Sequence, residues 1–194
     1  QYDTNYGLSE SIGPGCVHLG VDNIDKVGAI GKAGFGWETK IIDENGNLVA
    51  QGETGELAVK GPGVMTCYYK DEKATAEVLH DGWLYTGDMA MEDEDGFIYL
   101  VDRKKDVIIS GGENIYPREI EEYLYHMQGI KDIQVGGIPS EKYGEEVGAF
   151  IILQEGADLL PEDVKAFCRG KIARHKIPKY IFFVNSFPLT GSGK

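Results

Sequence analysis

One continuous stretch of the chain combines four different local signals, and it reads Asp102-Arg103-Lys104-Lys105-Asp106-Val107-Ile108-Ile109-Ser110-Gly111-Gly112-Glu113-Asn114-Ile115-Tyr116-Pro117-Arg118-Glu119-Ile120-Glu121. After Asp102 it has three consecutive basic residues, and after Asp106 it continues as a short apolar run that leads to the pair Gly111-Gly112. Pro117 then suits the first turn of a helix. The stretch therefore predicts a strand, a glycine turn and a helix directly after a cationic cluster, which is typical of a segment that binds phosphate and moves.

The residues after this stretch predict a small α+β domain. Apolar positions recur at helical spacing after Pro117, and a second helix is expected over 161–174. Short apolar runs predict strands at 107–110, 133–138, 147–153 and 180–184. The resulting order, β-α-β-β-α-β, favours a sheet with its helices on one face.

The residues before the stretch are richer in strand and turn signals. Asn45-Gly46 predicts a hairpin between strands at 39–43 and 48–51. Further strands are expected at 56–60 and 97–101, and a helix at 71–79. We therefore expect two domains, 1–104 and 105–194.

Composition limits the classes of function. The 194 residues are 42% hydrophobic and 26% charged, with a net charge of −13, which argues against general nucleic-acid binding. No apolar run reaches the length of a membrane span, and no secretory signal is found. Three scattered cysteines favour a reduced, cytoplasmic setting. Residues 161–194 nevertheless carry seven basic and two acidic residues, which suggests that this tail meets an anion.

Two motifs in the first half carry polar groups suited to a nucleotide. Tyr6-Gly7-Leu8-Ser9-Glu10 offers an aromatic ring, a hydroxyl and a carboxylate, which suit a base, a phosphate oxygen and Mg²⁺. Asp88 follows Gly87 and is placed to accept hydrogen bonds from ribose hydroxyls. Alone, the first motif is by default an ordinary polar loop, and the second is equally a capped turn.

Two motifs in the second half complete the set. The guanidinium of Arg103 suits phosphate or ribose oxygens, and Gly111-Gly112 lets the backbone approach a ligand or make a plain turn between strand and helix. Lys194 ends a loop of small residues that would let its charge reach a reacting centre. As an isolated feature this loop is a solvated terminus.

Taken in order, the four motifs resemble the AMP-forming acyl-CoA synthetases of the adenylate-forming superfamily, which also contains peptide-synthetase adenylation domains and luciferase. The resemblance covers the whole chain. It implies a β-rich end of a large domain with a distorted, barrel-like sheet, followed by a small mobile α+β domain. Upstream elements of the family, a phosphate loop and most of the acyl pocket, are not found, so the chain resembles the C-terminal portion of a longer enzyme and is expected to be inactive alone.

The resemblance also implies a role for each candidate residue. For ATP or AMP, Tyr6 would stack near adenine, Ser9 would contact the α-phosphate, and Asp88 and Arg103 would bind the ribose. Glu10 would coordinate Mg²⁺, and Lys194 would bridge the carboxylate and the α-phosphate. Lys105 would be the hinge, while Gly111 and Gly112 would line the channel for coenzyme A.

The implied reaction joins a carboxylic acid, fatty or aryl, to CoA through an acyl-adenylate. Within the family, the sequence of residues 106–117 resembles CoA ligases more than peptide-synthetase adenylation domains. Two alternatives stay open: an adenylation domain that loads a carrier-protein thiol, and a stand-alone nucleotide-binding or interaction module. The implied partners are the acid, ATP and CoA, with no nucleic acid and no membrane span, and the oligomeric state is left open.

Overall fold

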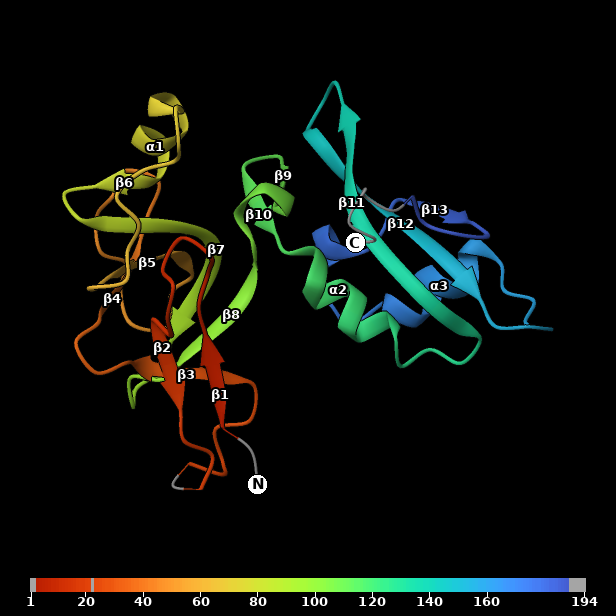
Figure 1. Cartoon of the computed structure of the whole chain (residues 1–194). Helices are drawn as coiled ribbons and strands as arrows, with labels where there is room; N and C mark the ends of the chain where they lie inside the picture. Colours follow the sequence, from red (N-terminus) through yellow and green to blue (C-terminus); the bar gives the residue numbers. More distant parts are fainter. Residues whose placement is uncertain (1–2, 22, 189–194) are drawn as a thin grey trace. The chain divides into compact units, whose positions relative to one another are not determined.

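A short 3-10 turn, η1 (Lys104–Asp106), lies where the chain passes from one structural unit to the next. In the computed structural model, which describes residues 3–21 and 23–188, unit 1 is Gln1–Lys105 and unit 2 is Asp106–Lys194 (Figure 1). The sequence places the domain boundary between residues 104 and 105, in the same turn. Each unit has its own cluster of buried apolar side chains.

Unit 1 is built on an eight-stranded sheet with the order β1-β2-β3-β8-β7-β5-β4, and β6 pairs with β7. Its one described helix is α1 (Glu72–Val78), which begins after Asp71 because that side chain accepts the Ala74 N–H. The strands are β1 (Thr4–Tyr6), β2 (Cys16–His18), β3 (Ala29–Ala33), β4 (Glu38–Ile42), β5 (Gly55–Lys60), β6 (Leu79–His80), β7 (Trp83–Glu92) and β8 (Ile98–Arg103).

Two expectations for unit 1 need correction. Among the described residues the sheet is open, with β1 and β4 at its ends, so it does not close into the barrel-like form that the resemblance implied. Residues 48–51 form no strand, and only Leu48 makes an isolated bridge, to Ile42. The Asp43 N–H donates to the Asn47 carbonyl oxygen and the Val49 N–H to that of Ile41, so the hairpin begins as expected. The pairing stops there because the chain turns at residues 50–53, where the Glu53 N–H donates to the Ala50 carbonyl oxygen at 3.0 Å.

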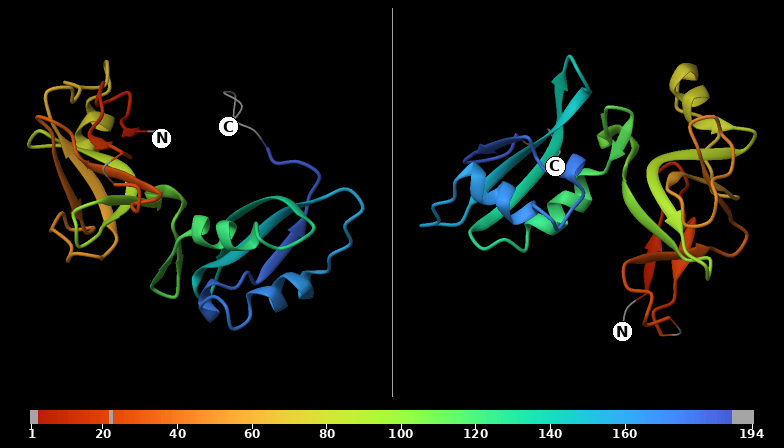
Figure 2. Two further views of the ribbon diagram at one scale, coloured as in Figure 1. Left: turned by 90° about the horizontal axis from the view of Figure 1, so that it is seen from below. Right: turned by 180° about the vertical axis from the view of Figure 1, so that it is seen from behind.

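Unit 2 contains a five-stranded sheet with the order β10-β9-β12-β11, and β13 pairs in parallel with β12. The long strands of this sheet lie side by side in both views of Figure 2. The elements are β9 (Ile108–Ser110), β10 (Glu113–Ile115), α2 (Pro117–Leu124), β11 (Ile130–Ser140), β12 (Gly144–Leu153), α3 (Pro161–Cys168), the 3-10 turn η2 (Arg174–Lys176) and β13 (Tyr180–Phe183).

Both helices of unit 2 bury side chains in the same core cluster. The helix α2 contributes Ile120 and Leu124, and α3 contributes Val164 and Cys168. Alternate residues of β12 complete the cluster, since successive strand side chains point to opposite faces. The α+β class expected from the sequence is confirmed.

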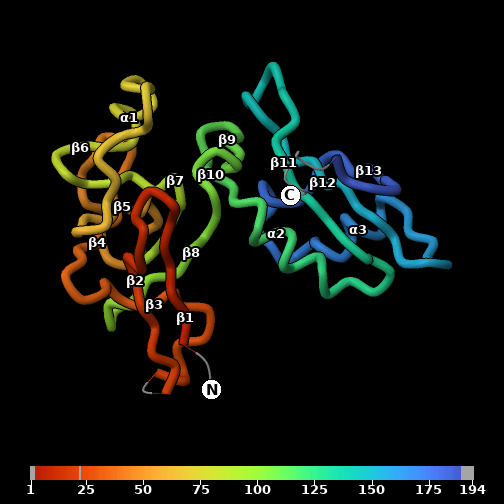
Figure 3. The backbone as a smooth tube through the Cα atoms, viewed as in Figure 1, coloured from red at the N-terminus to blue at the C-terminus, as the bar shows by residue number. Residues whose placement is uncertain are grey.

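The expected elements of unit 2 differ from the structure at two places. The strand β10 was not expected, because three residues beginning Glu-Asn carry little strand propensity. The helix α3 ends at Cys168 and not at 174, because Arg169 is extended and Gly170 has a φ of +71°. The backbone tube of Figure 3 shows how short both helices of this unit are. Along the described part of the chain, no helix is long and apolar enough to cross a membrane.

Candidate functional site

A cleft of about 510 Å³ in unit 1, here called the unit 1 cleft, collects parts of three of the four predicted motifs. It is lined by residues 7–10, by the middle of β7 and by Arg103 and Lys104 at the end of β8. Glu56, Tyr68 and Glu77 add further polar side chains. Segments as far apart in sequence as Gly7 and Lys104 therefore line one cavity, as a binding site requires.

Asp88 lies beside a bulge in β7, where the pairing of β5 with β7 shifts register between Glu56 and Ala58. Gly87 has a φ of +73° at this point, which glycine adopts without strain. The Asp88 N–H donates to the Thr86 hydroxyl at 3.1 Å, and this hydrogen bond stabilises the bulge. Bulges redirect side chains and occur often beside functional sites, and this one fixes where Asp88 points.

The carboxylate of Asp88 is 5% exposed and is held from both sides. The Tyr6 hydroxyl donates to Oδ2 at 2.6 Å, and the Arg103 Nε lies 2.8 Å from Oδ1. Asp88 and Arg103 are direct cross-strand partners between β7 and β8. The Tyr6 ring packs in the unit 1 core, and burial together with the bond to Asp88 raises the pKa of Tyr6 far above its usual value. The Tyr6 hydroxyl therefore keeps its proton near neutral pH and donates to Asp88.

The loop before β2 presents Ser9 and Glu10 to the unit 1 cleft. Glycine is required at position 7, because a Cβ there would lie 2.6 Å from the Gly13 carbonyl oxygen. The Tyr68 hydroxyl donates to Glu10 Oε1 at 2.8 Å, and burial with this bond raises the pKa of Tyr68. Among the described residues, no group of three or more His, Cys, Asp or Glu side chains could hold a metal by itself.

Glu56 is a functional candidate that the sequence reading missed. It is 7% exposed, and its carboxylate accepts the Gly87 N–H at 3.0 Å and the Lys104 ammonium at 2.7 Å. Because Gly87 precedes Asp88, this buried acid fixes the same bulge from the β5 side. The signal that could have revealed it is an acid directly before the buried apolar run Leu57–Val59.

In unit 2, Gly111 and Gly112 form the two-residue turn of a β-hairpin. Their φ angles are +62° and +89°, and the flanking residues Ser110 and Glu113 pair with each other. The plain strand-to-helix turn considered from the sequence is therefore a hairpin turn between β9 and β10. The Gly111 N–H donates to the Tyr143 carbonyl oxygen at 2.8 Å.

Gly111 also borders a larger cleft of about 910 Å³, here called the unit 2 cleft. Its basic lining residues are Lys165, Arg174, His175 and Lys179. The Lys179 ammonium donates to both Glu146 oxygens at 2.6 Å, which lowers the pKa of Glu146 and raises that of Lys179. Arg174 has no acidic partner within the described part of the chain, so its charge is available to an anion.

Four predicted residues of the described chain line neither cleft, namely Tyr6, Asp88, Lys105 and Gly112. Asp88 nevertheless lies next to Gly87 and pairs with Arg103, both of which line the unit 1 cleft. Lys105 is exposed in the middle of η1. Lys194 lies outside the residues that the structure describes.

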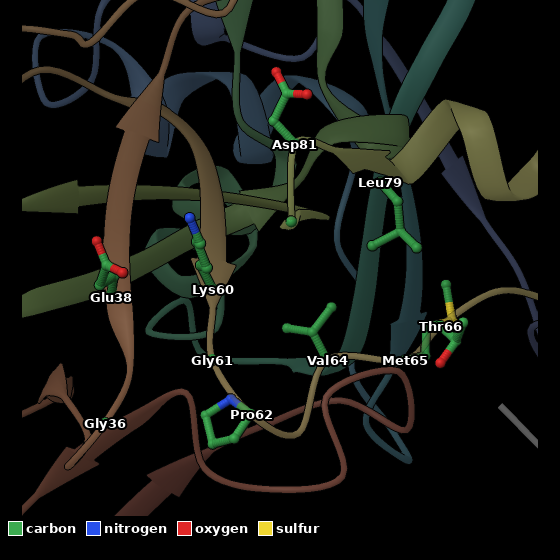
Figure 4. Close-up of a pocket in the computed structure, with 11 residues that line it drawn as sticks. Gly36, Glu38, Lys60, Gly61, Pro62, Val64, Met65, Thr66, Leu79 and Asp81 are labelled. Atoms are coloured by element: carbon green, nitrogen blue, oxygen red, sulfur yellow. The ribbon is translucent and has the colours of Figure 1, made fainter.

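A further cleft of about 540 Å³ in unit 1 contains none of the predicted residues (Figure 4). Glu38 and Lys60 line it from the neighbouring strands β4 and β5, and Asp81 joins them from the turn after β6. Glu38 and Lys60 are register partners on these strands, and Asp81 is exposed on its turn.

Family models match two parts of the chain. The model described as AMP-binding enzyme matches residues 4–69, and the model described as AMP-binding enzyme C-terminal domain matches residues 119–194. The two matches contain the Tyr6–Glu10 motif and Lys194 respectively.

Curated relatives and solved structures agree with the family models. The chain is 49% identical over 173 residues to a putative acyl-CoA synthetase of Bacillus subtilis, covering 88% of this chain and 32% of that protein. It is 46% identical over 190 residues to a long-chain-fatty-acid–CoA ligase of the same organism, covering 97% and 34%. The chain thus spans about a third of the length of these relatives.

A solved structure of o-succinylbenzoate CoA synthetase from Bacillus subtilis, in complex with its acyl-adenylate intermediate, superimposes with a TM-score of 0.89 at 34% identity. The match covers 99% of this chain and 39% of that one, and the same enzyme is solved with ATP and a magnesium ion. From the two clefts, the two family models and these relatives, it follows that the chain belongs to the adenylate-forming superfamily of AMP-binding enzymes.

Proposed function

We propose that this chain is part of an AMP-forming acid–CoA ligase, which converts a carboxylic acid, ATP and CoA into an acyl-CoA, AMP and pyrophosphate. The observation that carries the proposal is the buried carboxylate of Asp88, which is held by Tyr6 and Arg103 and follows Gly87; Gly87 and Arg103 line the unit 1 cleft. A carboxylate oriented in this way accepts hydrogen bonds from two adjacent hydroxyls, as on the ribose of a nucleotide.

The first half-reaction takes place at the unit 1 cleft. Asp88 and Arg103 bind the ribose, and Ser9 contacts the α-phosphate. Tyr6, whose hydroxyl donates to Asp88, lies near the adenine. Lys194, which the resemblance assigns to the carboxylate and α-phosphate, offsets negative charge that grows as the acid attacks. The acyl-adenylate forms and pyrophosphate leaves.

The donor set of the unit 1 cleft fits Mg²⁺ bound together with phosphates. Magnesium uses one or two protein carboxylates and completes its shell with waters and substrate phosphates, so Glu10 suffices as a protein ligand. The bond from Tyr68 leaves the second oxygen of Glu10 available to the ion. When bound, the ion neutralises phosphate charge.

The second half-reaction uses unit 2. The thiol of CoA attacks the acyl carbon of the adenylate, the C–O bond to the phosphate breaks, and AMP leaves. Gly111 and Gly112 line the channel for the thiol arm of CoA. Lys105 is the hinge about which unit 2 rotates, so that Lys194 leaves the reacting centre and this hairpin takes its place. The unit 2 cleft offers its basic groups, Arg174 foremost, to the phosphates of CoA.

A charge-reversal pair tests the phosphate contact. Arg174→Glu is expected to raise the KM for CoA about tenfold or more, because an anion loses a cation and meets a like charge. Lys171→Glu is the matched control, since Lys171 is equally exposed but does not line the unit 2 cleft. Equal KM values for CoA in the two variants would remove Arg174 from the phosphate site.

A screen of pyrophosphate release tests the proposed function as a whole. The full gene product is assayed with ATP and Mg²⁺ over fatty acids and aryl acids, with and without CoA. We expect acid-dependent pyrophosphate release and CoA-dependent acyl-CoA, with fatty or aryl acids as the best substrates. Transfer to a carrier-protein thiol and not to CoA would assign the adenylation-domain alternative. The 194-residue chain alone is expected to show little or no activity.

A further inference from the structure

The hairpin that carries Gly111 and Gly112 is joined to the rest of its sheet by few backbone bonds. Between β9 and β12 the register contains a single pair, Ser110 with Gly144. From Gly148 onward, β12 pairs with β13 instead. Ile108 and Ile115 anchor the base of the hairpin in the unit 2 core, and the Gly111 N–H donates to the Tyr143 carbonyl oxygen. The position of the turn itself therefore depends on the few bonds next to the Ser110–Gly144 pair.

A side chain continues the ladder where the backbone pairing ends. The Ile109 N–H donates to Glu145 Oε2 at 2.8 Å, directly beside the Ser110–Gly144 pair. Within the described residues, Glu145 forms no ion pair with a cation. The polar partner of its carboxylate is therefore the Ile109 N–H. A carboxylate bound to a backbone N–H makes a charge-assisted hydrogen bond, which is stronger than a neutral one.

The neighbouring strand leaves room for this carboxylate. A Cβ at Gly137 would lie 2.5 Å from Glu145 Oε1 and 2.7 Å from its Cδ, so any larger residue would displace the side chain. A Cβ at Gly136, the preceding residue of β11, would meet nothing within 4 Å. The absence of a side chain at Gly137 therefore makes room for the Glu145 carboxylate, whereas the absence of one at Gly136 does not affect it.

We propose that Glu145 is a positioning residue for the thiol-accepting step, which sets the Gly111–Gly112 turn through the Ile109 amide. The inference rests on the proposed function. It requires that loss of the Glu145 contact impairs attack by the CoA thiol while leaving adenylation, which uses the unit 1 cleft, unchanged.

Four variants of the full gene product test this role. Glu145→Ala and Gly137→Ala are expected to lower the rate of acyl-CoA formation about tenfold, since a lost charge-assisted bond corresponds to about one power of ten in rate. Acyl-adenylate formation, measured without CoA by pyrophosphate release with hydroxylamine trapping, stays within about twofold of wild type on the same reasoning. Glu145→Gln keeps an acceptor oxygen and rescues most of the rate, and Gly136→Ala behaves as wild type.

Amide hydrogen exchange in the 194-residue chain provides a readout that needs no activity. The Ile109 amide exchanges faster in Glu145→Ala and in Gly137→Ala than in wild type or Gly136→Ala. Unchanged exchange at Ile109, or equal loss of both half-reactions in folded Glu145→Ala, overturns the inference. If the wild-type protein forms no acyl-CoA, the proposed function fails and the inference with it. If the wild type and Glu145→Ala form acyl-CoA equally fast, only the inference fails.

Discussion

The Tyr6 hydroxyl donates to the buried carboxylate of Asp88 at 2.6 Å, across 82 residues of sequence. This bond and the ion pair with Arg103 occupy one site on each oxygen of Asp88 and leave the remaining lone pairs for a ligand. On the proposed function, Asp88 is oriented before the nucleotide binds, so its side chain loses little conformational freedom on binding.

Tyr6→Phe tests this orientation because it removes the donor and keeps the ring. We expect the KM for ATP to rise about tenfold and the free energy of unfolding to fall by about 1–3 kcal/mol, since a buried carboxylate loses a partner. Tyr99→Phe is the control, as its hydroxyl makes only a 3.4 Å contact, with Asp93 outside the unit 1 cleft. An ATP KM equal to wild type in Tyr6→Phe would show that Asp88 does not need the hydroxyl.

Glu56→Ala is expected to weaken both the fold and nucleotide binding. The substitution leaves the Gly87 N–H and the Lys104 ammonium without their acceptor, and we expect a loss of about 1–3 kcal/mol in the free energy of unfolding. Glu56→Gln retains an acceptor oxygen for Gly87 and should lose less. Urea denaturation measures the stability of both variants, and the KM for ATP of the full gene product measures nucleotide binding. Glu44→Ala, at an exposed position in a turn, is the control. A Gln variant as unstable as the Ala variant would contradict the role given to the Gly87 bond.

The three cysteines are expected to differ in reactivity. Cys67 is exposed, whereas burial raises the pKa of Cys16 to about 12 and that of Cys168 to about 11. In the native protein near pH 8, a disulfide reagent should therefore modify one thiol quickly, and all three after denaturation. Three thiols reacting at one rate in the native protein would contradict the buried positions.

The same pKa values fix the sign of a pH effect. Both folded-state values lie above the ordinary thiol value, so this contribution to stability is complete below about pH 9 and is lost as pH rises toward the folded values. Urea midpoints measured at increasing pH above 9 should fall less in Cys16→Ala than in wild type.

Lys105→Pro tests the hinge. Lys105 is exposed in the middle of η1, and we expect the circular dichroism spectrum to be retained while one half-reaction is impaired more than the other. Proline fixes φ and would restrict the rotation that exchanges the two half-reactions. Lys105→Ala is the control, because it removes the charge and keeps the backbone free. Equal loss of both half-reactions in a folded Lys105→Pro protein would count against a hinge at this residue.

Local signals in the sequence predicted the elements whose cause is local. Pro117 begins α2 and Ile120 is buried, as the helical spacing indicated. Asp71, by contrast, became an N-cap through a bond that only the structure shows. The sequence could not reveal elements created by distant pairing: β10 exists because a two-glycine turn folds it onto β9.

The candidate site follows the same division. Ser9, Glu10, Asp88 and Arg103 could be named because they stand in recognisable motifs. Glu56 and Glu145 could not, because each acts on a backbone amide of another segment, Gly87 and Ile109 respectively. The bulge in β7 exposes the Gly87 amide that Glu56 accepts from, and the short pairing of β9 with β12 leaves the Ile109 amide for Glu145. Both features arise from strand pairing, which the sequence does not show.

The central claim is that the reaction passes through an acyl-adenylate, and transfer of an oxygen atom from the acid to AMP tests it directly. The full gene product is incubated with ATP, CoA and a carboxylic acid labelled with heavy oxygen in its carboxylate, and the recovered nucleotide is analysed by mass spectrometry. If the carboxylate attacks the α-phosphate and the thiol then attacks the acyl carbon, the AMP retains one oxygen of the acid. Unlabelled AMP, or ADP with labelled phosphate, would contradict an adenylate-forming ligase.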